Sequence, residues 1–174
     1  MRFFTVLPLF FLTIVAQAQK SPLVTSDSLS QQKWVDSKYS AMSLEERVGQ
    51  LFMVSVGSNE KKSSTDRIKA LIQKHHIGGV IFLPGGPVGQ AKLTNTYQQA
   101  SKTPLLIGMD AEWGLAMRLD STYAFPWNMT LGAIPHDSVV EKVGYRIGEH
   151  AKRLGVHINF APVLDININP ENPI

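Results

Sequence analysis

The chain contains no cysteine among its 174 residues. A domain of this size without disulfides relies on its hydrophobic core, and apolar residues make up 44% of the sequence. Charge is also scarce: 18% of the residues are charged, the formal net charge is +3, and the basic residues are scattered along the chain. Nucleic-acid-binding domains gather basic residues on one face, so we expect no nucleic-acid partner.

The sequence also lacks the motifs of common metal and cofactor sites. Its five histidines do not follow the spacing of zinc ligands. The glycine-rich segment 85–89 lacks the Gly-Lys-Ser/Thr ending of a phosphate-binding loop. No Gly-x-Ser-x-Gly stretch, which would carry a nucleophilic serine, is present. We therefore expect neither a metal nor a cofactor.

One long apolar run stands at the N-terminus, where Arg2 precedes Phe3–Val15 and Ala16-Gln-Ala18 follows. A positive segment, an apolar segment and a small-x-small site are the three parts of a secretory signal peptide. The run contains Pro8 and is shorter than the roughly 20 apolar residues of a membrane-spanning helix. We expect residues 1–18 to be a signal peptide, the chain to be exported to the periplasm or the cell exterior, and no membrane span to remain after cleavage.

The rest of the chain divides into a polar part and a patterned part. Residues 19–41 are expected to form an irregular tether or an N-terminal wrap, and residues 42–174 to form the folded domain. In that domain short apolar runs alternate with amphipathic segments, and Ser43 with Glu46 forms a capping box at the start of the first helix. This alternation predicts parallel strand–helix–strand units and an α/β fold. The expected strands are 51–56, 80–83, 104–109 and 156–161, and the expected helices start at Ser43 and cover 64–76, 90–100 and 137–154.

The strand expected over 104–109 runs directly into a polar segment that contains Asp110, Glu112 and Arg118. α/β barrels place their binding groups at the carboxyl ends of strands. Asp110 either accepts hydrogen bonds from ligand hydroxyls or caps the next helix or pairs with Arg118. Arg118 either contacts several oxygens of a polar ligand or forms a salt bridge. Spacing alone leaves both alternatives open.

Four further residues belong to this prediction. Asp165 is expected at the end of the fourth strand, where it either contacts a ligand or orients loop backbone. Trp113 either stacks on a sugar ring or packs in the protein. Asn159 is expected to be a buried polar group with its hydrogen bonds satisfied. Gly108 would allow a backbone segment or a ligand to come close.

Four segments, taken in order, resemble the N-terminal (β/α)8 barrel of glycoside hydrolase family 3. They are Ser43–Leu51, Ile77–Phe82, Ile107–Gly114 with Arg118, and Gly155–Asp165 followed by Asn169–Pro173. The resemblance implies a TIM barrel of which only about the first half, four strands of eight, is present. A typical barrel of this kind needs about 250 residues. Residues 42–174 would then be a partial N-terminal barrel domain.

The resemblance also implies an activity: retaining hydrolysis of a terminal β-linked sugar by double displacement, closest to the β-N-acetylhexosaminidase branch. In that branch the residues that match Asp110 and Arg118 hold the terminal sugar, and Asp165 joins them as a predicted substrate-binding residue through its position. The segment Ala111–Gly114 departs from the Gln-Glu-Gly-Gly of that branch. This departure leaves the exact sugar open.

The family's nucleophile and acid–base motifs come later than Asp165, so we assign no catalytic residue in this chain. The chain is expected to be an inactive fragment of an exported glycosidase, whose remaining half-barrel lies in the full-length protein, and its partner is a small or oligosaccharide substrate. One alternative is a β-glucosidase or xylosidase of the same family. Another is a non-catalytic carbohydrate-binding protein.

Overall fold

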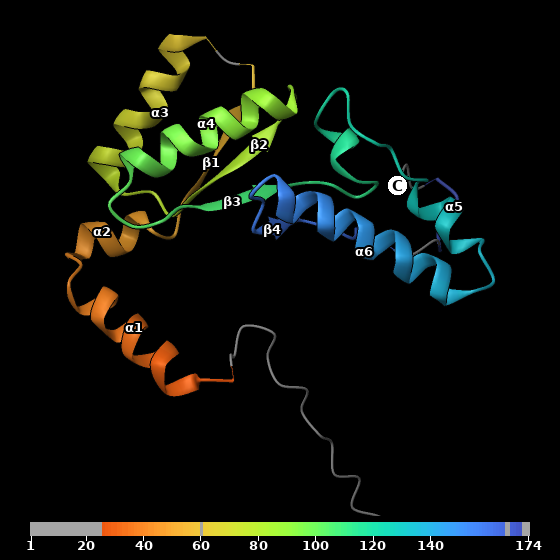
Figure 1. Cartoon of the computed structure of the whole chain (residues 1–174), viewed down its shortest axis with the longest axis horizontal. Coiled ribbons are helices and arrows are strands. Elements are labelled where there is room, and N and C mark those ends of the chain that lie inside the picture. The colour runs from red at the N-terminus through yellow and green to blue at the C-terminus, as the bar shows by residue number, and fades with distance from the viewer. Residues whose placement is uncertain (1–25, 60, 166–167, 172–174) are drawn as a thin grey trace, which may run out of the picture. The chain divides into compact units, whose positions relative to one another are not determined.

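A computed structural model describes residues 26–59, 61–165 and 168–171 (Figure 1). The expected signal peptide, 1–18, lies outside the described residues. The chain divides into two compact units, Met1–Ala41 and Met42–Ile174. Across the described ranges, no helix is both long and apolar enough to cross a membrane.

The first unit contains helix α1 (Ser28–Ser40). The irregular structure expected over 19–41 is therefore wrong for Ser28–Ser40, whereas the role of this segment as a tether stays a prediction. Asp27 caps the helix, because its carboxylate accepts a hydrogen bond from the backbone N–H of Ser30 at 2.9 Å. The helix buries none of its residues, so it has no apolar stripe that would have predicted it.

Four parallel strands form the sheet of the second unit, in the order β1-β2-β3-β4. They are β1 (Met53–Gly57), β2 (Gly79–Leu83), β3 (Leu106–Met109) and β4 (Ile158–Asn159). Parallel neighbours that follow one another in sequence require a crossover between each pair, as in the predicted α/β fold. The predicted fold class is confirmed, and in the described residues the sheet is open rather than closed into a barrel.

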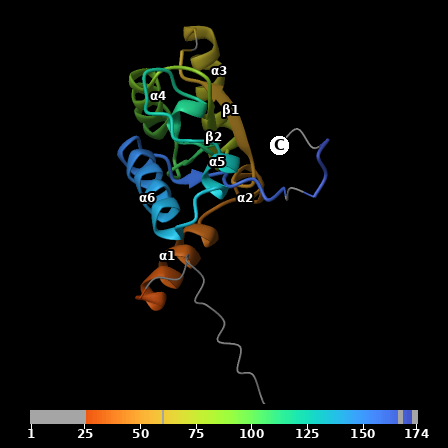
Figure 2. The same ribbon diagram turned by 90° about the vertical axis from the view of Figure 1, so that its right-hand side faces the viewer.

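Helices fill the connections between the strands. One precedes β1 and three longer ones form the crossovers: α2 (Leu44–Gly49), α3 (Lys62–His75), α4 (Pro87–Ala100) and α6 (Asp137–Arg153). Figure 2 shows α3, α4 and α6 on the same side of the strands. Two short elements that we had not predicted lie between β3 and α6: the 3-10 helix η1 (Leu115–Met117) and helix α5 (Asn128–Gly132).

The core lies between the sheet and the crossover helices. On the two central strands Val80, Phe82, Ile107 and Met109 are fully buried. Each large apolar side chain that is removed from water contributes about 1.5–3 kcal/mol to stability. The helices complete the core with buried side chains at 3.6-residue spacing, namely Ile68 and Ile72 of α3, Tyr97 of α4, and Ile147 and Ala151 of α6.

All four strands differ in length from the prediction. β2 begins one residue before the expected range 80–83, and β3 begins two residues after the expected start at 104. β1 starts at Met53 because Leu51 and Phe52 belong to a turn, closed by hydrogen bonds from their N–H groups to the carbonyls of Val48 and Gly49. The fourth strand was expected over 156–161, but β4 contains only Ile158 and Asn159. The chain leaves the sheet soon afterwards at Pro162, which has no N–H to donate to a neighbouring strand.

Candidate functional site

The strand register brings four segments together at one end of the sheet. Gly57 pairs with Leu83, and Met109 pairs with Phe82 on one side and with Asn159 on the other. We call this end the carboxyl edge; it consists of the residues that follow the strands, 58–59, 84–86, 110–120 and 160–165. Ligand sites of parallel α/β folds lie at this end of the sheet.

Asp110 and Arg118 meet at the carboxyl edge. The Arg118 Nη2 donates to Asp110 Oδ2 at 2.6 Å, and the two side chains are 24% and 28% exposed, respectively. The pair therefore remains open to solvent on one side. Among the described residues, the buried Nε of Arg118 has no hydrogen-bond partner. A guanidinium and a carboxylate that are joined by one bond keep further donors and acceptors for a ligand with several hydroxyl groups.

Arg118 is held by the end of β2. It caps η1, and its carbonyl accepts a hydrogen bond from the Gly85 N–H at 3.0 Å, while Asp120 N–H donates to the Gly85 carbonyl at 2.9 Å. A Cβ at Gly85 would overlap the hydroxyl of Ser58, so only glycine fits there. Beside this contact is a hollow of about 390 Å³, lined by Asn59, Pro84, Gly85 and residues 116–120.

Asp110 is held from the other side by β4. The Asn159 Oδ1 accepts a hydrogen bond from the Ala111 N–H at 2.9 Å, and its Nδ2 donates to the Ala111 carbonyl at 3.3 Å. This two-point bond restrains the backbone one residue beyond Asp110. Asn159 was expected to be buried and satisfied. Its hydrogen bonds are satisfied, but its side chain is exposed, because β4 is the outer strand of the described sheet.

Gly108 does allow a close approach, and the approaching group is a side chain of the protein. A Cβ at Gly108 would lie 2.8 Å from the ring of Phe160 and 3.0 Å from the Met53 sulfur. The Phe160 N–H also donates to the Met109 carbonyl at 2.9 Å. The glycine thus lets the segment after β4 lie against β3, next to Asp110.

Glu112 and Trp113 turn to a different partner, the start of α5. Glu112 Oε2 accepts a hydrogen bond from the Asn128 side chain at 3.5 Å. The ring centroids of Trp113 and Trp127 are 5.6 Å apart, and the two planes are tilted by 39°. Trp113 is half-buried, so it packs within the protein, which is one of its two predicted roles. The other, stacking on a sugar ring, stays a prediction.

Asp165 is not brought into this group. It lies on an irregular, exposed segment six residues beyond the end of β4, and within the described residues no hydrogen bond or ion pair links it to Asp110 or Arg118. Its assignment to substrate binding stays a prediction. In the described part of the chain, no group of three or more His, Asp or Glu side chains is placed to hold a metal ion.

Asn159 is the site residue that the sequence did not reveal as such. Its partner, Ala111, is 48 positions away, and the contact depends on the β3–β4 register. The one available signal was a polar residue inside an apolar run, which indicated a satisfied hydrogen bond but not its target. Asn128 and Trp127 gave no signal, because α5 was not expected.

The domain has a parallel α/β sheet with an aspartate–arginine pair at its carboxyl edge. This arrangement is typical of barrel-like domains, whose ligand sites lie at this end. The family model described as the glycosyl hydrolase family 3 N terminal domain matches residues 43–174. The chain therefore belongs to glycosyl hydrolase family 3, as the motifs had indicated.

Two relatives match most of the chain. The β-hexosaminidase A of Pseudoalteromonas piscicida is 31% identical over 95% of this chain and 29% of its own length. The β-N-acetylglucosaminidase/β-glucosidase of Cellulomonas fimi is 30% identical over 81% of this chain and 24% of its own length. The chain thus spans less than a third of the length of these relatives.

Solved structures give the same fold. A β-glucoside phosphorylase, BglX bound to 2FGlc, matches 83% of this chain and 26% of its own chain at 28% identity, with a TM-score of 0.75. NagZ from Neisseria gonorrhoeae, in complex with N-trifluoroacetyl-D-glucosamine, matches 66% of this chain and 36% of its own at 20% identity and a TM-score of 0.52. The second likeness is one of fold alone.

Proposed function

We propose that this chain supplies the sugar-holding part of an exported glycosidase that removes terminal β-linked N-acetylhexosamine with retention of configuration. Asp110 accepts hydrogen bonds from hydroxyl groups of the terminal sugar, and Arg118 donates to the same sugar. The nucleophile and the acid–base group of the reaction would come from sequence beyond Ile174. The full-length enzyme would cleave the bond through a covalent glycosyl–enzyme intermediate.

The observation that carries this proposal is the Asp110–Arg118 pair at the carboxyl edge. Its 2.6 Å bond aligns the carboxylate, and its partial exposure leaves both groups within reach of a ligand. A sugar offers adjacent hydroxyl groups that donate and accept hydrogen bonds, which an acceptor-only carboxylate and a donor-only guanidinium can satisfy together. The names of two relatives, β-hexosaminidase A and β-N-acetylglucosaminidase/β-glucosidase, support an N-acetylhexosamine as the sugar.

A second candidate is a β-glucoside as the substrate. The name of the Cellulomonas fimi relative includes β-glucosidase, and the structural neighbour with a TM-score of 0.75 is a β-glucoside phosphorylase. The segment Ala111–Gly114 differs from that of the β-N-acetylhexosaminidase branch directly beside Asp110. The two candidates differ in the group on carbon 2 of the sugar, so a binding comparison separates them.

Calorimetry with the 174-residue chain tests the binding. We expect N-acetylglucosamine to bind more tightly than glucose, and Asp110→Ala to abolish the binding of both. Asp66→Ala is the matched control, because Asp66 is an exposed aspartate on α3 that pairs only with Lys62 in the described residues. A preference for glucose would favour the second candidate, and no binding of either sugar would overturn the proposal.

A hydrolysis assay tests where the chemistry lies. The purified chain is expected to release no phenol from an aryl N-acetyl-β-glucosaminide, whereas the full-length protein releases it. Release by the chain alone that survives further purification would show that a nucleophile is present within these residues. The assignment of Asp110 to sugar holding would then have to be revised.

A further inference from the structure

Two tryptophans form a pair beside the Asp110–Arg118 site. Trp113 comes three residues after Asp110, so their Cα atoms lie at most about 11 Å apart. Its ring packs against that of Trp127, which lies just before α5 and is 68% exposed. Trp113 is half-buried. The pair therefore has an inner ring, Trp113, and an outer ring, Trp127, with much of its surface in contact with water.

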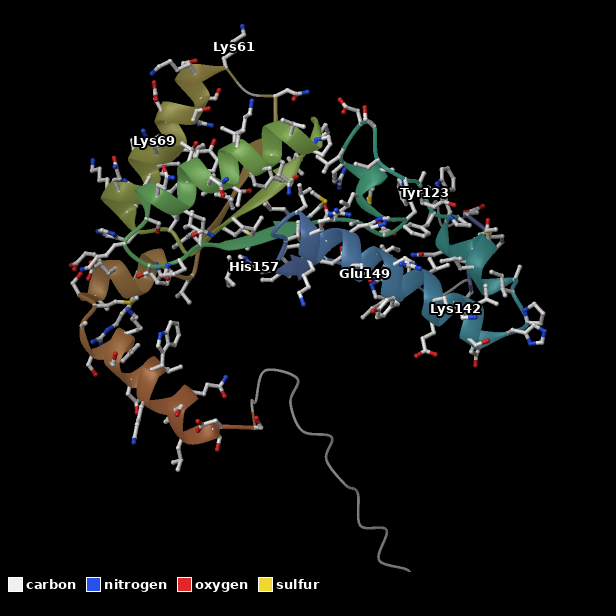
Figure 3. All side chains as sticks on the ribbon, in the orientation of Figure 1. Lys61, Lys69, Tyr123, Lys142, Glu149 and His157 are labelled. Atoms are coloured by element: carbon white, nitrogen blue, oxygen red, sulfur yellow. The ribbon has the colours of Figure 1, made fainter. Side chains whose placement is uncertain are left out.

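The pair is built on restrained backbone. The Trp113 carbonyl accepts a hydrogen bond from the Phe125 N–H at 3.0 Å. Gly114 follows with a φ of +90°, a backbone conformation that residues other than glycine rarely adopt. A Cβ at this position would also lie 2.8 Å from the Phe125 ring. Phe125 in turn contacts Tyr123, with ring centroids 4.8 Å apart. Figure 3 shows Tyr123 in the segment between η1 and α5, where this aromatic group lies.

Polar groups accompany the two rings on the same two segments. Glu112 precedes Trp113 and Asn128 follows Trp127, and their side chains share one long hydrogen bond of 3.5 Å. Both keep capacity for further hydrogen bonds, since a carboxylate has about four acceptor positions and an amide has two donors. The arrangement therefore joins a flat apolar surface to polar groups at its rim.

This combination matches the chemistry of a pyranose ring. Such a ring has a face of C–H groups, which packs against an aromatic surface, and hydroxyl groups around its edge, which form hydrogen bonds. The outer ring, Trp127, is 68% exposed and so leaves an aromatic surface against which such a ring can pack. An exposed aromatic face with hydrogen-bonding side chains next to it provides both kinds of contact that this ligand would use.

We propose that Trp127, supported by Trp113, is a stacking platform for a second sugar ring of the substrate, next to the terminal sugar held by Asp110 and Arg118. Glu112 and Asn128 form hydrogen bonds with the hydroxyl groups of this second ring. The proposal rests on the proposed function, because it assigns the neighbouring position to the terminal sugar. It predicts that the site prefers a disaccharide to a monosaccharide.

The test uses the full chain with Trp34→Phe. Trp34 lies on α1 in the first unit, and its replacement leaves Trp113 and Trp127 as the only tryptophans. We would titrate this protein with N-acetylglucosamine and with its β-1,4-linked disaccharide, following tryptophan fluorescence. The disaccharide is expected to bind about tenfold more tightly and to change the emission more strongly.

In the same background, Trp127→Ala is expected to remove the advantage of the disaccharide and to leave the affinity for the monosaccharide unchanged, as measured by calorimetry. Trp127→Phe should restore part of the advantage, because it restores an aromatic face. Tyr145→Ala is the matched control: Tyr145 is an equally exposed aromatic residue (67%) on α6, and its removal should change neither affinity. Far-UV circular dichroism confirms that each variant is folded.

An undiminished disaccharide advantage in Trp127→Ala would overturn the platform, as would equal losses for the two sugars. If Asp110→Ala still abolishes monosaccharide binding in that case, the proposed function survives without the platform. If neither sugar binds to the Trp34→Phe chain, the proposed function and the platform are both overturned.

Discussion

The two ends of the sheet are built differently. At the amino end, where α2 leads into β1, backbone atoms are in direct contact and charged groups are paired. At the carboxyl edge, the Asp110–Arg118 pair is partly exposed, the Arg118 Nε has no partner among the described residues, and Trp127 is 68% exposed. The difference matches the division of labour in α/β barrels, in which the amino end serves stability and the carboxyl end carries the ligand site.

The amino end is closed by glycines and by one carboxylate. A Cβ at Gly49 would overlap the His75 carbonyl, and one at Gly78 would overlap the Gln50 carbonyl. Glu46 accepts hydrogen bonds from Lys102 Nζ at 2.7 Å and from the Ser43 N–H at 2.8 Å, so it links α2 to the segment before β3. The predicted capping box is confirmed in both of its hydrogen bonds.

The largest expected effect is that of Gly49→Ala. The added methyl group meets backbone oxygens that cannot move without displacing α3, so we expect a loss of about 3 kcal/mol in the free energy of unfolding. The same change at Gly148, in the interior of α6 with no atom within 4 Å of an added Cβ, should stabilise the protein by about 1 kcal/mol. Urea denaturation of both variants measures the contrast, and equal effects would contradict it.

A smaller loss is expected from Asn159→Ala at the carboxyl edge. It leaves the buried N–H and C=O groups of Ala111 without their partner, at a cost of about 1–2 kcal/mol. The affinity for the sugar should fall as well, because the backbone next to Asp110 is no longer restrained. Asn95→Ala on the exposed face of α4 is the control, with no loss expected in either quantity. An unchanged sugar affinity in Asn159→Ala would show that the contact between Asn159 and Ala111 does not position Asp110 for binding.

The smallest expected effect is the loss of stability at acidic pH that comes from Glu46 at the amino end of the sheet. The hydrogen bond from Lys102, and then that from the Ser43 N–H, hold the pKa of Glu46 below its usual 4.5. Because the folded pKa is depressed, the charged form contributes stability that is present above about pH 4.5 and is lost as the pH falls through the folded value.

The variant that tests this contribution is Glu46→Gln. It should lower the urea midpoint at pH 7, and its difference from the wild type should shrink as the pH falls below the usual pKa of 4.5 and through the folded value. Sugar binding at pH 7 should be unchanged, in contrast to Asn159→Ala. A difference that stays constant down to the lowest pH at which both proteins remain folded would show that the charge of Glu46 is not responsible.

Local signals predicted most of the framework. The apolar repeat over 137–154 predicted α6 to within one residue, and the apolar runs predicted four strands that alternate with helices along the chain. Elements without such signals were missed. Helix α1 buries no residue, and α5 has five residues and no side-chain cap. The end of β4 was also misplaced, because an apolar run does not indicate where hydrogen bonding to the neighbouring strand stops.

The sequence by itself determined the α/β class, the α6 stripe, the capping box of Ser43 and Glu46, and the presence of Asp110 at a strand end. These properties depend on periodicity and on neighbours within a few positions. The tertiary structure alone decided that Arg118 pairs with Asp110, that Asn159 restrains Ala111, and that Trp127 covers Trp113. Such contacts join residues 8 to 48 positions apart, and their geometry follows from strand register and loop path, to which no local pattern is sensitive.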